Sequence, residues 1–81
     1  MGKERNPMTG PLIGFKTVLG SDAKRDGRYL ELIELESGDE VAEVFFADEE
    51  VKWQITIFKQ DMPLEVIEAF IAKAKLELPI P

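Results

Sequence analysis

The sequence predicts an α+β domain, in which a four-stranded antiparallel β-meander is packed on one face by a single C-terminal α-helix. Apolar and polar residues alternate strictly over 51–57, which is typical of a half-buried strand and predicts one over 51–58. Apolar residues recur at helical spacing over 64–78, and three strand-like segments separated by turn residues come earlier. The 81 residues suffice for one modest core, so we expect a disordered tail over 1–11 and a single α+β domain over 12–81.

The first two strands are expected over 12–19 and 28–36. The segment between them, 20–27, is polar and has glycine at both ends. It is therefore expected to be a loop, and a long one for a hairpin.

The apolar residues of the second strand change sides midway. Leu30 and Leu32 have one parity, whereas Ile33 and Leu35 have the other. A strand buried on both faces, or a β-bulge, would produce this change.

Gly38 and Asp39 predict a tight turn into a third strand over 41–47, with a positive φ at Gly38. A two-residue turn pairs Leu35 with Ala42. A four-residue loop then pairs Phe46 with Val51 and Val44 with Trp53 in the fourth strand. In this register, the face toward the helix carries Ile33, Leu35, Ala42, Val44, Phe46, Trp53, Ile55 and Ile57.

The helix is expected to begin after Asp61 as its N-cap, with Pro63 in the first turn, and to end before Pro79. Its apolar stripe should cover the sheet and bury Trp53. The stripe consists of Leu64, Ile67, Phe70, Ile71, Ala74 and Leu78.

Four further apolar residues fall on the opposite sheet face in this register: Leu30, Leu32, Phe45 and Phe58. One helix cannot cover both faces, and an uncovered apolar patch marks an interaction surface. The alternative is that the sheet curls and the N-terminal strand folds over the patch.

Acidic residues gather over 31–50, which holds nine acids and no base in a chain of net charge −6. The plain interpretation is a solvated hairpin whose charges protect a sheet edge. The functional interpretation is a surface that attracts a basic partner. The candidate interaction surface therefore comprises the acidic Asp39, Glu40, Glu43, Asp48, Glu49 and Glu50 and the apolar Leu30, Leu32, Phe45 and Phe58.

The composition removes most catalytic and metal chemistry. The chain has no histidine and no cysteine, so it lacks the commonest general base, the commonest zinc ligand and any thiolate. Glu34 and Glu43 face each other in the expected register, but nothing nearby supplies a nucleophile. The acidic segment lacks calcium-loop spacing, and the basic loop 21–28 lacks P-loop spacing. We therefore predict no catalytic residue, no metal ligand and no cofactor.

These observations favour a small acidic, non-enzymatic protein-interaction module, such as an adaptor, a regulator or a toxin-neutralising immunity-type protein, with a basic protein as partner. The alternative is a homodimer that self-associates through the second apolar sheet face. The element order also resembles that of small single-stranded-DNA-binding coactivators, which implies a nucleic-acid binder. A pI near 4.6 argues against nucleic acid. The chain has no apolar run of about 18 residues, so we expect no membrane partner and a cytoplasmic location.

Overall fold

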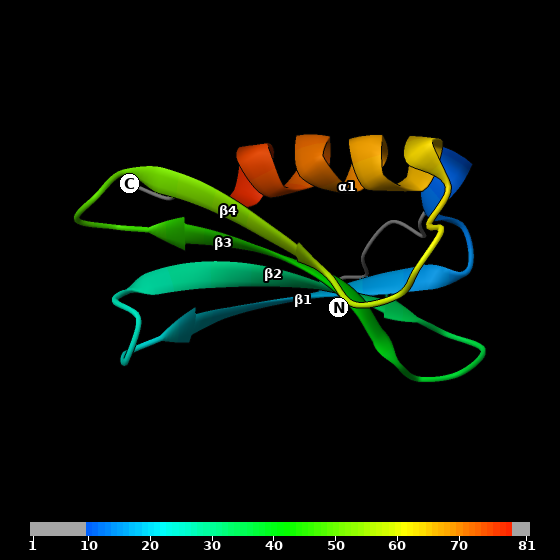
Figure 1. The fold of residues 1–81 in the computed structure, drawn as a ribbon, viewed down its shortest axis with the longest axis horizontal. Helices are drawn as coiled ribbons and strands as arrows, with labels where there is room; N and C mark the ends of the chain where they lie inside the picture. The colour runs from blue at the N-terminus through cyan, green and yellow to red at the C-terminus, as the bar shows by residue number, and fades with distance from the viewer. Residues whose placement is uncertain (1–9, 79–81) are drawn as a thin grey trace, which may run out of the picture.

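One antiparallel sheet and one C-terminal helix make up the fold (Figure 1), seen in a computed structural model that describes residues 10–78. The strands follow one another across the sheet in sequence order, which confirms the predicted β-meander with one helix. The elements are the 3-10 helix η1 (Gly10–Leu12), β1 (Phe15–Asp22), β2 (Gly27–Glu34), β3 (Glu40–Ala47), β4 (Lys52–Ile57) and α1 (Leu64–Glu77). Most of the predicted tail over 1–11 lies outside the described residues.

The first strand does join the sheet, but it begins later than predicted. β1 pairs with β2 from Phe15 opposite Glu34 to Asp22 opposite Gly27. The loop between them has four residues instead of eight, because Asp22 closes a tight turn. Its Oδ1 accepts hydrogen bonds from the backbone N–H of Lys24 (3.0 Å) and of Arg25 (3.3 Å).

The predicted register between β2 and β3 is wrong. Leu30 pairs with Val44 and Leu32 pairs with Ala42, so both leucines are buried in the helix-side core. Leu35, which was expected there, is exposed. The register differs from the expected one by three residues, because Ala42 pairs with Leu32 instead of Leu35. An odd change of register moves every side chain to the other face, so this error exchanged the two faces of β2.

The cause is the length of the turn. The connection runs over 35–39 instead of two residues, although Gly38 has the expected positive φ of 78°. The turn closes at Glu34, whose N–H donates to the Asp39 carbonyl (2.9 Å) and whose carbonyl accepts from the Gly38 N–H (2.7 Å). The register also shifts between Leu32 and Ile33, which is the irregularity that the change of parity indicated.

The β3–β4 register is offset by two residues from the expected one. Trp53 lies opposite Phe46 instead of Val44. An even offset leaves every side chain on the predicted face. Trp53 is half-buried beside Phe46, with ring centres 4.8 Å apart, instead of fully buried under the helix.

The helix begins at Leu64, with Pro63 in the N-cap position. The predicted cap at Asp61 is wrong, because this residue has a φ of 58° and no side chain caps the helix. Leu64 is exposed, so the buried stripe starts at Val66. The core consists of Leu12, Leu30, Leu32, Val41, Ala42, Val44, Val66, Phe70, Ala74 and Leu78. Over residues 10–78, no helix is long and apolar enough to cross a membrane.

Candidate functional site

The sheet face turned away from α1 brings together an unusual set of side chains from β2, β3 and the β1–β2 loop. Glu31 lies opposite Glu43, and Tyr29 lies opposite Phe45. These pairs alternate with the core pair Leu30 and Val44, so they lie on the other side of the sheet. We call this surface, with Arg25 and Glu40 beside it, the open face.

Arg25 folds back from the β1–β2 loop over the open face. Its guanidinium donates to both carboxylate oxygens of Glu43, at 3.3 Å and 3.0 Å, and its Nε donates to Asp22 at 2.7 Å. The Arg25 Cζ lies 4.1 Å from the centre of the Phe45 ring. Carboxylate pairing and an aromatic face thus hold one guanidinium from three sides.

These contacts shift two pKa values. The hydrogen bond from Arg25 lowers the pKa of Asp22. The hydrogen bonds to Glu43 and then to Asp22 raise the pKa of Arg25. Both shifts favour the charged forms that the ion pairs need.

Two glycines let the aromatic rings lie flat on the sheet. A Cβ at Gly20 would meet the Tyr29 ring, and a Cβ at Gly27 would meet the Phe46 carbonyl oxygen and the Phe45 ring. Phe45 is therefore buried, although no helix covers it.

The four residues predicted to form an exposed apolar patch do not form one. Leu30 and Leu32 are in the core on the other side, and Phe45 is buried beneath Arg25. Of the four residues predicted to form it, Phe58 alone is exposed. The open face is polar at its surface because a loop and its arginine cover the aromatic floor.

Three glutamates form a compact group on the open face. The carboxylates of Glu31, Glu40 and Glu43 offer oxygen atoms that all lie within 4.8 Å of one another. Burial raises the pKa of Glu40, and the neighbouring Glu31 and Glu43 carboxylates raise it further. Across residues 10–78, Glu43 forms an ion pair with Arg25, whereas Glu31 and Glu40 form none.

The sequence-based reasoning missed Glu31, because the expected register set Glu34 opposite Glu43. That prediction is wrong: Glu31 lies opposite Glu43 in β3, and Glu34 lies opposite Phe15 of β1. Its carboxylate accepts hydrogen bonds from Ser37 at 2.8 Å and from Lys59 at 3.1 Å. These two contacts, the serine first, lower the pKa of Glu34. The correct register would have identified Glu31.

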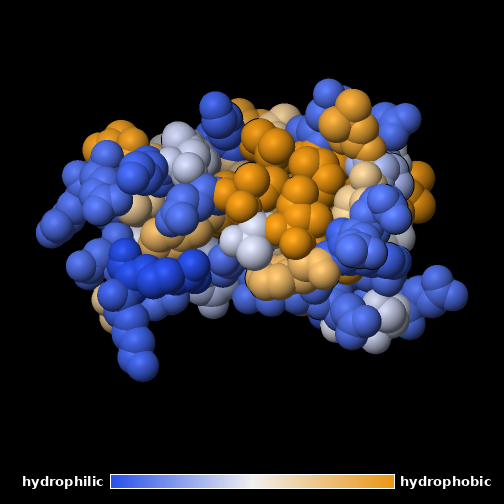
Figure 2. Space-filling view, in the orientation of Figure 1, coloured by the Kyte–Doolittle hydropathy of each residue, from blue (hydrophilic) through white to orange (hydrophobic). Residues whose placement is uncertain are grey.

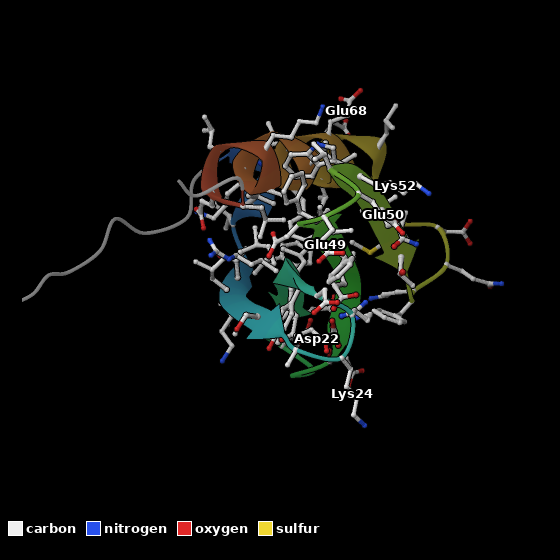
Figure 3. The ribbon with its side chains drawn as sticks, turned by 90° about the vertical axis from the view of Figure 1, so that its left-hand side faces the viewer. Asp22, Lys24, Glu49, Glu50, Lys52 and Glu68 are labelled. Atoms are coloured by element: carbon white, nitrogen blue, oxygen red, sulfur yellow. The ribbon has the colours of Figure 1, made fainter. Side chains whose placement is uncertain are left out.

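The other predicted acids lie at the two ends of the sheet. Asp39 is in the β2–β3 turn, whereas Asp48, Glu49 and Glu50 form the β3–β4 turn at the far end. This far end also carries bases: Figure 3 shows Glu49, Glu50 and Lys52 at the same end as Asp22 and Lys24. A shallow hollow of about 260 Å³ there is lined by Arg25, Asp26, Phe45, Ala47, Glu49, Glu50 and Gln54. The lining of this hollow carries both acidic and basic side chains, whereas the group of Glu31, Glu40 and Glu43 is wholly acidic.

No protein-family model, curated protein or solved structure matches this chain. The candidate function therefore rests on the geometry of the open face.

Proposed function

We propose that this chain is a small non-enzymatic protein-interaction module that binds a basic side chain of a partner protein at Glu31, Glu40 and Glu43. The observation that carries the proposal is the grouping of three carboxylates of which one, Glu43, is paired with a cation, Arg25. A second positive charge would relieve the repulsion between them and the cost of burying Glu40. An adaptor, a regulator or an immunity-type inhibitor would use such a surface.

Arg25 supports this choice of ligand because it is an internal example of the same recognition. A guanidinium already lies on this face, held by a carboxylate and by an aromatic ring. Planar guanidinium groups pair with carboxylates through two parallel hydrogen bonds. We infer that an arginine or lysine of a partner approaches Glu31 and Glu40 from the side that Arg25 leaves open.

The charge of the chain supports a protein partner over nucleic acid. A net charge of −6 speeds the approach of a basic protein and opposes a phosphate backbone. The on-rate should therefore fall as salt rises, because salt screens the attraction.

The test compares two double variants that each remove two negative charges. Glu31→Gln with Glu40→Gln alters the open face, and Asp48→Asn with Glu49→Gln alters the β3–β4 turn as the matched control. The wild type and both variants are immobilised and exposed to a native lysate at low salt, with the fold checked by circular dichroism. We expect the open-face variant to lose its bound proteins and the turn variant to keep them.

Two outcomes would contradict the proposal. Equal recovery from both double variants would show that net charge, and not the glutamate group, attracts the partners. Calcium binding to the wild type in a calorimetric titration, lost in the open-face variant, would assign the group to a metal instead.

A further inference from the structure

β4 is an edge strand with an apolar surface beside it. It is the last strand in the sheet, so within residues 10–78 β3 alone pairs with it. Ile55, Ile57 and Phe58 are 41%, 47% and 56% exposed, respectively. Figure 2 shows apolar side chains gathered on the side of the molecule where β4 runs below α1. Apolar edge strands readily pair with another chain.

The free backbone groups of β4 belong to its helix-side residues. The Phe58 N–H donates to the Val41 carbonyl at 2.8 Å. Bonding direction alternates along an antiparallel strand, so Thr56 and Gln54 also bond inward to β3. The N–H and C=O groups of Ile55 and of its neighbours 53 and 57 therefore point outward.

One flank of α1 runs alongside this edge. The Lys75 Nζ lies 5.6 Å from the centre of the Trp53 ring. At the other end, Ile67 and Ile57 line one hollow of about 400 Å³. Ile71 lies midway between Ile67 and Lys75, so it belongs above the middle of β4.

We propose that two copies of this chain associate edge to edge, with β4 antiparallel to β4 of the second copy about a two-fold axis through Ile55. This register pairs Ile55 with itself and Trp53 with Ile57. It uses the outward groups of all three residues and continues one sheet across both copies. The two helices then lie side by side on the same face, with Ile71 meeting Ile71.

Charge complementarity favours a second copy as the occupant. Glu68 and Lys75 lie seven residues apart on α1, on either side of Ile71. Glu68 is exposed and points to solvent (Figure 3). The same two-fold axis therefore brings Glu68 of one copy beside Lys75 of the other. It likewise brings the Glu50 and Lys52 end of β4 toward the Lys59 and Asp61 end of its partner strand, so each end offers one acid and one base to the other.

The experiment measures mass in solution by sedimentation equilibrium. The wild type should show twice the chain mass of 9.2 kDa at concentrations on the order of 100 μM, well above a micromolar dissociation constant. Ile57→Lys should convert it to a monomer. Leu19→Lys on the opposite edge strand β1 is the matched control, because both side chains are 47% exposed, and it should leave the dimer intact.

A cysteine at the axis gives a second, independent measurement. The chain has no cysteine, so Ile55→Cys introduces a unique thiol. Hydrogen-bonded antiparallel partners have Cα atoms about 5.5 Å apart, which a disulfide can span. Mild oxidation should link this variant into covalent dimers and leave Leu19→Cys unlinked.

A monomeric wild type, or a dimer that survives Ile57→Lys but not Leu19→Lys, would overturn the proposal. The open-face variants leave β4 unchanged, so failure of the basic-partner proposal and failure of this one are separately visible.

Discussion

The Arg25 guanidinium lies directly over the Phe45 ring, 4.1 Å from its centre, where the β1–β2 loop folds back on the open face. Arg25→Ala should lower the free energy of unfolding by about 1 kcal/mol, because it removes a cation–π contact and two ion pairs of modest individual value. Urea denaturation measures the change. Lys24→Ala, at the neighbouring exposed position, is the control, and an equal effect there would show that the stack adds no stability.

The β2 register can be tested by removing one leucine at a time. Leu30→Ala should cost about 2–5 kcal/mol, because Leu30 is fully buried in the core. Leu35→Ala should cost less than about 0.5 kcal/mol, because Leu35 is exposed. The register expected from a two-residue turn predicts the reverse order, so thermal or urea unfolding of the two variants decides between them.

The two glycines under the aromatic rings should differ in how much stability is lost when each is replaced by alanine. Gly27→Ala should cost about 1–3 kcal/mol, because the new Cβ meets the Phe46 backbone carbonyl, which cannot move freely. Gly20→Ala meets the Tyr29 side chain instead, which can rotate away, so we expect a smaller loss. Comparable melting temperatures for the two variants would contradict this account.

Glu40 should make the protein less stable as pH rises. Its pKa is raised in the folded state, so folding takes up a proton between that raised value and its ordinary value of 4.5. The contribution of Glu40 to the free energy of unfolding is therefore most favourable below pH 4.5 and is lost as pH rises through the raised pKa. Glu40→Gln should be more stable than wild type at pH 7, and the advantage should vanish below about pH 4.5.

Urea denaturation from pH 4 to pH 8 measures the difference between variant and wild type. Taking the difference removes the opposite trend from Asp22 and Glu34, whose lowered pKa values make acid destabilising. Glu36→Gln, at an exposed position in the β2–β3 turn, controls for the change in net charge. A constant difference for Glu40→Gln across the pH range would refute the assignment.

The elements of this fold are predictable because two periodicities in the sequence are clear. The alternation over 51–57 assigned the faces of β4 correctly even though its register was wrong by two residues. The β2 strand was ambiguous because Leu30 and Leu35 have opposite parity and are equally apolar. The length of the Gly38 turn decided between them, and backbone hydrogen bonds at Glu34 fixed that length.

The open face shows the same limit. Glu40 and Glu43 were among the predicted residues, whereas Glu31 depended on a register that the sequence left open. The covering of Phe45 by Arg25 could not be foreseen, because it depends on the conformation of the β1–β2 loop. The local sequence pattern predicts which side chains of a strand share a face, whereas the conformation of the loops decides which residues of other elements they contact.

The order of the strands has a kinetic consequence. Each strand pairs with its neighbour in sequence through a loop of four or five residues, and short loops close with little loss of chain entropy. The sheet should therefore assemble rapidly from any of its three hairpins. The contact of η1 with α1 is different, because Leu12 joins Phe70 in the core across most of the chain. We expect this contact to form late, so that Leu12 governs how long a folded molecule persists before it opens.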